Sequence, residues 1–239
     1  MPSHVTSSTL KLFADDSLLY NPIHHPGDLS DLQEDLNSLF AWSENSQINF
    51  NTSKCQHIRI DRGNFTLPIS NYTMSSETIA SVDSVKYLGV TIDERLSFNN
   101  HITEICSKAN RTLTMLMRNL KKAKRKTRIL AYKKICRPKL EYASQVWSPH
   151  LQKHIDCIEA INRRAFRWCF NYRKYDKISE CMFLNNWPTM ESRRTESDLR
   201  FYMRIVGGEV CVVTINSPLI LVKTIKPDSM AQRVILIQT

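Results

Sequence analysis

The chain has 239 residues, 42% of them hydrophobic, and a formal net charge of +10. This much apolar material predicts one large domain or two small ones with real cores, and it excludes a disordered polypeptide. No apolar run approaches the roughly 20 residues of a membrane span, and the first residues lack the pattern of a secretion signal. We therefore expect an intracellular protein without a membrane partner.

The charge is segregated along the chain. Residues 1–100 carry a net charge of −6, residues 101–175 carry +15, and residues 176–239 carry +1. A middle segment this basic indicates an anionic partner, and nucleic acid is the leading candidate. The alternatives are a solvated basic helix or a localisation signal, and the second would make the nucleus the location.

The seven cysteines are scattered and form no Cys-x-x-Cys pair, which is typical of reduced thiols rather than a disulfide framework or a zinc finger. One weak metal-like cluster consists of His150, His154 and Cys157, which are spaced for a single helical face. The start of an ordinary amphipathic helix explains the same spacing, and no fourth ligand is close in sequence.

An acidic pair stands near the start of the chain, where apolar residues flank Asp15 and Asp16 on both sides. This pattern predicts a strand, a tight turn and a second strand. Successive side chains of a strand point to opposite faces, so adjacent carboxylates can approach one metal ion only where the chain turns. The alternative is a surface turn with two solvated aspartates, because Asp is a common turn residue.

The next elements complete a small antiparallel sheet with a packed helix. Asp28 is the expected N-cap of an amphipathic helix that carries leucines at helical spacing. Lys54 lies at the mouth of a strand predicted over 55–60. A short strand is expected near Thr78 and Ile79, and a longer one over 85–92 is expected to bend at Gly89.

From about residue 96 the hydrophobic period becomes helical. Helices are predicted over 102–120, over 125–136 with an end before Pro138, and over 154–170, followed by shorter ones at 177–184 and 193–206. The tail contains strand-like segments at 210–215 and 234–237. Most aromatic residues of this region are expected in the core, and a few could stack on bases. The candidate nucleic-acid-binding residues are Lys121, Lys122, Lys124, Arg125, Lys126, Arg128, Lys133, Lys134, Arg163, Arg164 and Arg167.

The predicted fold class is α+β, with a sheet unit over 1–95, a basic all-α unit over 96–206 and a tail over 207–239. Four segments in this order resemble the reverse transcriptases of LINE-type (non-LTR) retrotransposons, over about residues 10–205. They are Phe13-Ala14-Asp15-Asp16; the helix end with Ile48-Asn49-Phe50-Asn51-Thr52-Ser53-Lys54-Cys55; Val85-Lys86-Tyr87-Leu88-Gly89-Val90-Thr91-Ile92-Asp93; and the helices around Pro138–Trp147 and Ile158–Ala165. The resemblance implies a partial polymerase palm, a thumb-like helical domain and a tail outside the family pattern.

The resemblance also implies roles for individual residues. Asp15 and Asp16 would be catalytic ligands of Mg²⁺, with Asp15 the more important, and Lys54 would assist the departure of pyrophosphate. The hairpin of Tyr87, Leu88 and Gly89 would grip the primer end. The implied partners are an RNA template and a DNA primer, held by the basic helices, and nucleotide and metal are the only small molecules implied.

One part of such a site is missing from the sequence. Two-metal catalysis needs a further carboxylate from a separate strand, and residues 1–14 contain no Asp or Glu. We therefore expect the C-terminal fragment of a reverse transcriptase that does not polymerise DNA alone. The alternatives are a nucleic-acid-binding remnant without chemistry, acting through residues 101–175, and an unfolded relic of a decayed element.

Overall fold

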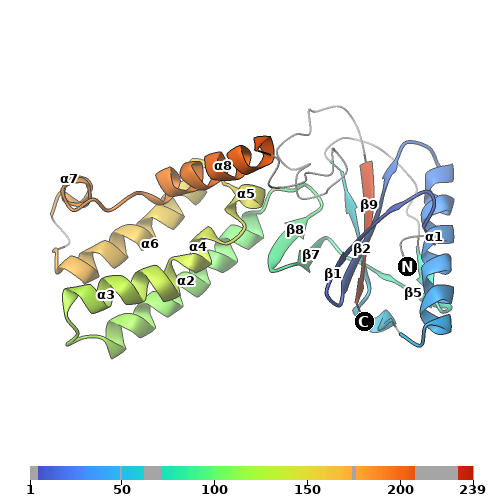
Figure 1. Ribbon diagram of the computed structural model, residues 1–239, viewed down its shortest axis with the longest axis horizontal. Coiled ribbons are helices and arrows are strands. Elements are labelled where there is room, and N and C mark those ends of the chain that lie inside the picture. The colour runs from blue at the N-terminus through green and yellow to red at the C-terminus, as the bar shows by residue number, and fades with distance from the viewer. Residues whose placement is uncertain (1–4, 49, 62–70, 174–175, 208–230, 239) are drawn as a thin grey trace. The chain divides into compact units, whose positions relative to one another are not determined.

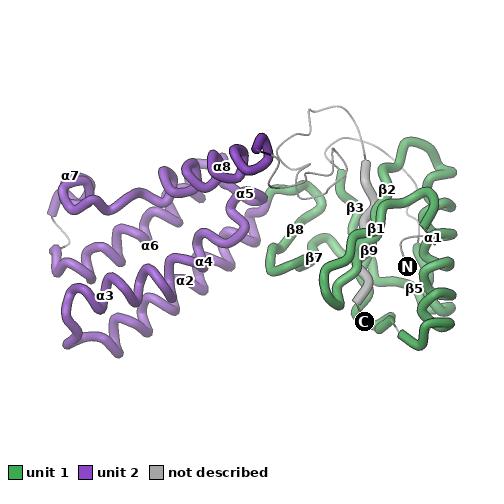
Figure 2. Tube along the Cα trace, in the orientation of Figure 1, with its two compact units in different colours: residues 1–97, 224–239 green, residues 98–223 purple. Residues whose placement is uncertain are grey.

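The structure is a computed structural model that describes residues 5–48, 50–61, 71–173, 176–207 and 231–238. It divides into two compact units (Figures 1 and 2). The first combines residues up to Ser97 with a strand from the end of the chain, and the second begins at Phe98. A mixed sheet with one long helix in the first unit, and helices in the second, give the α+β class that the sequence predicts.

The first unit is built on a five-stranded sheet with the order β1-β2-β9-β3-β6. The strand β9 comes from the far end of the chain and pairs antiparallel with both of its neighbours, so that Ile235 lies opposite Leu19 on one side and His57 on the other. The strands are β1 (Thr9–Phe13), β2 (Asp16–Ile23), β3 (Gln56–Ile60), β6 (Ala80–Ser81) and β9 (Ala231–Gln238). Two smaller sheets pair β4 (Thr73–Met74) with β5 (Glu77–Thr78), and β7 (Ser84–Tyr87) with β8 (Val90–Asp93).

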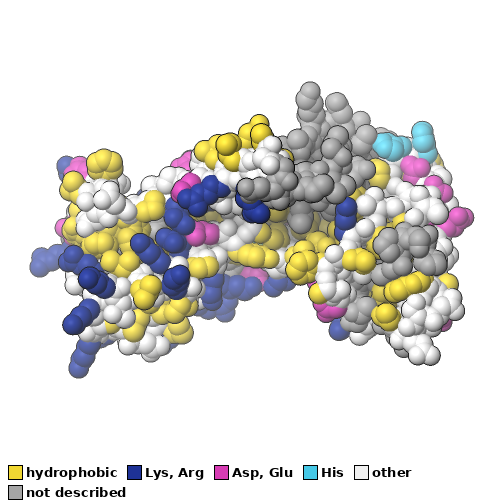
Figure 3. Space-filling model, in the orientation of Figure 1, with side chains coloured by type: hydrophobic (Ala, Val, Ile, Leu, Met, Phe, Trp, Pro, Cys, Tyr) yellow, Lys and Arg dark blue, Asp and Glu magenta, His cyan; other side chains and the backbone are white. Residues whose placement is uncertain are grey.

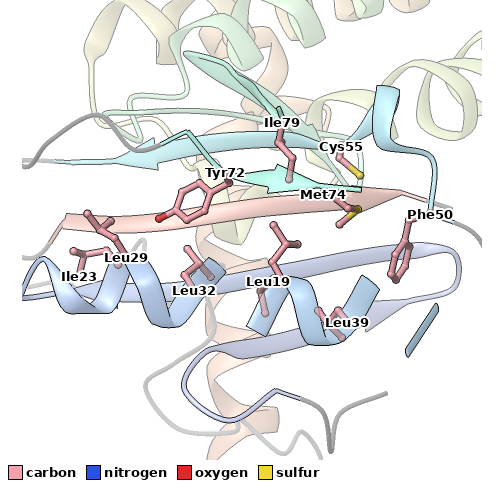
Figure 4. Packing of buried hydrophobic residues seen from close by; sticks show 11 residues of the cluster. Leu19, Ile23, Leu29, Leu32, Leu39, Phe50, Cys55, Tyr72, Met74 and Ile79 are labelled. Carbon is pink, nitrogen blue, oxygen red and sulfur yellow. The ribbon is translucent and has the colours of Figure 1, made fainter. Parts of the chain in front are cut away.

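The core of this unit lies between the sheet and helix α1 (Gly27–Asn45), as Figure 4 shows. The buried helix positions recur every three or four residues, which places them on one face. The cluster comprises Leu19, Ile23, Leu29, Leu32, Leu36, Leu39, Phe50, Cys55, Tyr72, Met74 and Ile79. Burial of a large aliphatic side chain contributes about 1.5–3 kcal/mol, so this one cluster supplies much of the driving force for the unit.

The start of α1 differs from the sequence prediction, because Asp28 is not the N-cap. The helix begins at Gly27 after Pro26, and Asp28 lies inside the first turn. Its carboxylate reaches back and accepts hydrogen bonds from the backbone N–H groups of His24 and His25, at 2.6 and 2.8 Å. The bond from His25 first, and then the bond from His24, hold the pKa of Asp28 below its usual value.

A second carboxylate of α1 fixes the segment before β1. The buried Asp35 accepts hydrogen bonds from the backbone N–H groups of Thr6, Ser7 and Ser8, at 2.8, 3.0 and 2.6 Å. Burial alone would raise the pKa of Asp35, but these hydrogen bonds outweigh it and lower the pKa. This anchor could not be predicted from the residue pattern, because its donors are backbone groups.

The strand expected over 85–92 is instead a hairpin of β7 and β8. Leu88 and Gly89 form its two-residue turn and both have positive φ, 46° and 81°. Two consecutive residues in the left-handed region reverse the chain, whereas the expected bulge at one glycine would only bend it. Tyr87 and Val90 therefore face each other across the turn.

The second unit is entirely helical over its described residues. It contains α2 (Asn99–Asn119), α3 (Arg125–Ala131), the π-helical turn η3 (Tyr132–Cys136), α4 (Pro138–Glu141), α5 (Ser144–Trp147), α6 (Gln152–Phe170), α7 (Ile178–Leu184) and α8 (Met190–Val206). The helix predicted over 125–136 agrees with α3 and η3, which end at Cys136. After Arg137, which keeps helical dihedral angles, the short helix α4 begins at Pro138 itself. Arg137 donates its N–H to the Tyr132 carbonyl, five residues back, at 2.9 Å. This wide turn accommodates a proline, which has no N–H to offer the preceding turn.

A buried hydrogen-bond network holds α6 against the segments on either side. The side-chain oxygen of Asn162 accepts from Tyr132 at 2.9 Å and from the Trp187 indole at 2.8 Å. Its amide nitrogen donates to Glu159 at 2.9 Å and to the Pro188 carbonyl at 3.1 Å. Because the amide of Asn162 is fully partnered, it fixes one arrangement of these helices without the cost of an unsatisfied buried group.

The two strand-like segments of the tail have different outcomes. The segment 210–215 lies outside the described residues, whereas 234–237 is confirmed as part of β9. Within the described residues, every helix is too short or too polar to cross a bilayer.

The central position of β9 gives a prediction about stability. Ile235→Pro removes a backbone N–H from a strand paired on both sides, so the first unit should lose about 3 kcal/mol or more of unfolding free energy. Denaturant unfolding followed by circular dichroism measures this loss. Ile235→Val, which keeps the N–H and the β-branched side chain, is the matched control and should unfold within about 1.5 kcal/mol of the unaltered chain. Equal unfolding curves for the proline variant and the control would contradict the central placement of β9.

Candidate functional site

The acidic pair lies at the tip of the β1–β2 hairpin, as the sequence predicts. Phe13 and Asp16 face each other across the ladder, and Ala14 and Asp15 form the turn between them. Ala14 has a φ of 52°, in the left-handed region where residues with a side chain are strained. Asp15 is exposed at the tip, while Asp16 is half-buried at the first position of β2.

Lys54 reaches the same end of the sheet from another element. It is exposed at the end of the short helix η2 (Thr52–Lys54), directly before β3. The strand β9 lies between β2 and β3, with Gln238 opposite Asp16 and Leu236 opposite Gln56. Asp16 and the start of β3 are therefore about two strand spacings apart at one sheet end, on the order of 10 Å.

The β7–β8 hairpin, which the resemblance implies would hold the primer end, lies close enough to Asp16 for this carboxylate to affect the pKa of Tyr87. Tyr87 is buried, whereas Leu88 is half-buried and Gly89 is exposed at the turn. Burial raises the pKa of Tyr87, and the negative charge of Asp16 raises it further. The fold thus brings together the acidic hairpin, the start of β3 and the β7–β8 hairpin, which are separated in the sequence.

The carboxylates at this end do not complete a two-metal site. In the described part of the chain, no three side chains of His, Cys, Asp or Glu are placed to share an ion. The residue opposite Asp16 on β9 is Gln238, and 231–238 contains no Asp or Glu. Two Mg²⁺ ions demand more oxygen ligands than Asp15 and Asp16 supply, so the residues present do not fit a paired-metal centre.

The weak cluster of His150, His154 and Cys157 is not a metal site either. The Nε2 atom of His154 lies 2.6 Å from the side-chain oxygen of Asn99, so its ring contacts α2. Burial, followed by the positive charges of Lys153 and His150, lowers the pKa of His154. His154 and Cys157 lie in the first turns of α6, whereas His150 precedes the helix, so the amphipathic helix start is the better explanation of the spacing.

The basic candidates all lie in the helical unit, where Figure 3 shows lysine and arginine side chains gathered on the visible face. Their exposure is not uniform, because Arg128 and Arg167 are half-buried. The exposed ones are Lys121, Lys122, Lys124, Arg125, Lys126, Lys133, Lys134, Arg163 and Arg164. A surface this rich in cations, with few acids to neutralise it, favours binding of phosphate groups.

Two of the arginines also hold helices together. Arg128 donates to the Trp168 carbonyl at 3.1 Å, to Asn171 at 2.7 Å and to the Lys121 carbonyl at 2.8 Å. Arg164 donates to Asn110 at 2.8 Å and to Thr114 at 3.2 Å on α2. Their side chains are therefore oriented by the fold, in contrast to an ordinary solvated basic helix.

Aromatic rings lie beneath two of the exposed cations, and the sequence did not predict these pairs. Arg125 lies 5.2 Å from the ring centre of Phe170, and Lys133 lies 6.0 Å from that of Trp187. These distances are within the range of cation–π attraction. The sequence predicted that most of these rings fill the core and that a few could stack on bases. The cation–ring pairs depend on how α3 and η3 pack against α6 and the segment between α7 and α8.

The chain is similar in sequence to RNA-directed DNA polymerases of mobile elements. The chain is 30% identical over 142 residues to the RNA-directed DNA polymerase from mobile element jockey of Drosophila melanogaster, covering 58% of this chain and 15% of that protein. It is 27% identical over 164 residues to the probable RNA-directed DNA polymerase from transposon X-element of the same species, covering 67% and 18%. The jockey polymerase of Drosophila funebris is 28% identical over 140 residues, covering 57% and 15%. Neither a protein-family model nor a solved structure gives a significant match.

These similarities confirm the resemblance to reverse transcriptases of LINE-type elements. The chain spans between 15% and 18% of the length of these curated relatives. The similarity therefore covers a part of a polymerase and leaves the activity of this chain to be tested directly.

The proximity of Asp16 and Tyr87 gives a prediction that spectroscopy can check. Asp16→Asn removes a negative charge beside the phenol, so the pKa of Tyr87 should fall toward its ordinary value. Ultraviolet absorbance titration of tyrosinate measures the change, with Tyr87→Phe identifying the signal. Asp31→Asn, an exposed acid on α1, is the matched control and should leave that titration unchanged. An unchanged Tyr87 titration in the Asp16 variant would show that the two groups are not close.

Proposed function

We propose that this chain is the C-terminal part of an RNA-directed DNA polymerase of a LINE-type retrotransposon, with an incomplete catalytic site and a nucleic-acid-binding helical unit. The first unit is a partial palm and the second a thumb-like domain. The observation that carries the proposal is the grouping of Asp16, Lys54 and the Tyr87 hairpin at one end of the sheet, in a chain similar to such polymerases. RNA template and DNA primer are the proposed partners.

The proposed roles follow from where each group lies. Asp15 and Asp16 present acceptor oxygens that would hold one end of a Mg²⁺-bound nucleotide, and Lys54 offers a positive charge to a phosphate group. The exposed turn of Leu88 and Gly89 can approach a nucleic-acid strand closely, because Gly89 carries no side chain. The described residues place no third carboxylate with Asp15 and Asp16 to share an ion. These groups therefore would not assemble the two-metal centre that nucleotide addition needs.

The second candidate function is nucleic-acid binding without chemistry, and the arrangement of the basic surface favours it. The exposed lysines and arginines come from α3, η3 and α6 and from the turn before α3. Each phosphate contact releases condensed counterions, so binding through these residues should fall steeply as salt increases. Binding of this kind needs no carboxylate and is therefore separable from polymerase activity.

The first test is primer extension on an RNA template with Mg²⁺. We expect no incorporation by this chain alone, because no three acidic or other metal-ligating side chains of the described residues are placed to share an ion. Binding of the same primer–template by the same preparation is the control that the protein is folded and engaged. Incorporation that disappears in the Asp15→Ala variant would overturn the prediction of inactivity.

The second test asks whether nucleic-acid binding depends on the basic run before and at the start of α3 or only on the net charge of the protein. Glutamine substitution of Lys121, Lys122, Lys124 and Arg125 should weaken binding to duplex by about tenfold or more, and should reduce the salt slope by up to about 0.9 per lost phosphate contact. The matched control removes four exposed cations elsewhere in the helical unit, Lys153, Lys177, Arg200 and Arg204.

Fluorescence anisotropy across a salt series measures both sets. If the control weakens binding as much as the first set, the basic run is not the binding surface. Asp15→Ala should leave this binding unchanged, since the acidic hairpin belongs to the other unit.

A further inference from the structure

Two cysteines of the helical unit lie side by side although 50 residues separate them in the sequence. Cys106 is on α2 and is 4% exposed, whereas Cys157 is on α6 and is exposed to solvent. Both helices belong to the same compact unit and pack against each other. One thiol is thus sheltered between helices while the other faces solvent.

Hydrogen bonds on both sides fix how α2 and α6 align at this point. Toward the helix starts, His154 contacts Asn99 at 2.6 Å. Toward the helix ends, Arg164 donates to Asn110 at 2.8 Å and to Thr114 at 3.2 Å. The contacts occur in the same order along both helices, so the helices run in the same direction, and Cys106 and Cys157 lie between the two bracketing contacts.

We propose that Cys106 and Cys157 form a reversible disulfide that links α2 to α6 when the protein meets a hydroperoxide. The bracketing contacts place both cysteines on the same stretch of the α2–α6 interface. The Cys157 side chain also raises the pKa of Cys106, as expected for two thiols that lie near each other. Helices that pack this closely bring facing residues near the Cα separation of about 4.4–6.8 Å that a disulfide requires. This site is independent of the polymerase-like groups, because those lie in the other unit.

The two thiols have different environments, which determine which of them reacts with the peroxide first. Burial first, and then the contact with Cys157, raise the pKa of Cys106 to about 12, so this thiol stays protonated near neutral pH. The exposed Cys157 therefore reacts first with hydrogen peroxide, forming a sulfenic acid and water. The Cys106 sulfur then attacks the Cys157 sulfur, the S–O bond breaks, and the proton of Cys106 leaves with the hydroxyl group as a second water.

With hydrogen peroxide as the oxidant, the atoms and electrons of this reaction balance. Two thiols lose two electrons and two protons, and one hydrogen peroxide becomes two waters. A dithiol reductant reverses the step by thiol–disulfide exchange.

Peptide mapping of the folded full chain tests the proposal. The protein is treated with hydrogen peroxide, its remaining thiols are blocked, and tryptic peptides are analysed without reduction. We expect a linked pair of Leu96–Lys108 with His154–Arg163, since each of these peptides holds one cysteine. The pair should disappear after treatment with dithiothreitol.

Cys157→Ser should abolish the linked pair, and because this position is exposed the variant should fold normally. Cys181→Ser, in the same unit, is the matched control and should give the linked pair in undiminished yield. Oxidation of Cys157 to sulfinic acid while Cys106 stays reduced would overturn the proposal, as would a disulfide of either residue with another cysteine.

Discussion

The first unit depends on one interaction, the double ladder that β9 makes with β2 and β3. Each residue of a central strand satisfies its backbone groups on neighbouring strands, and β2 and β3 have no ladder to each other in the observed order. Without β9 the sheet would divide into a hairpin and a separate short parallel pair. Because β9 lies between β2 and β3, it also sets the distance between Asp16 and the start of β3.

The same strand accounts for the chemical character of the site. It occupies the position next to the acidic hairpin, yet its sequence from Ala231 to Gln238 brings no carboxylate. The backbone of β9 pairs Gln238 with Asp16, so the position opposite Asp16 in the ladder holds no acidic residue. Within the described residues, the strand therefore joins the sheet without adding an acidic group to this end.

Local patterns in the sequence predicted much of this structure. The acidic hairpin, the strand after Lys54 and the helices at α2 and α6 follow from hydrophobic periodicity and turn residues, which depend on neighbours only a few positions away. The error at Asp28 occurred because its carboxylate accepts hydrogen bonds from backbone amides that precede the helix. The short helix that begins at Pro138 was not predicted, because it follows a π-helical turn.

The long-range features could not be predicted in the same way. The segment 234–237 was recognisable as a strand, but nothing in its composition indicated β2 and β3 as its partners, because strand pairing depends on contacts between distant parts of the chain. The pairing of Tyr132 and Trp187 with Asn162 is of the same kind. For the site, the sequence indicates acidic and basic candidates, whereas the proximity of Asp16 to Tyr87 follows only from the fold.

Nuclear Overhauser effects between backbone protons of isotope-labelled protein give the decisive test of whether β9 lies between β2 and β3. We expect contacts from the Ile235 region to the Leu19 region on one side and to the His57 region on the other. Close backbone contacts directly between the Leu19 and His57 regions, with none to Ile235, would contradict it.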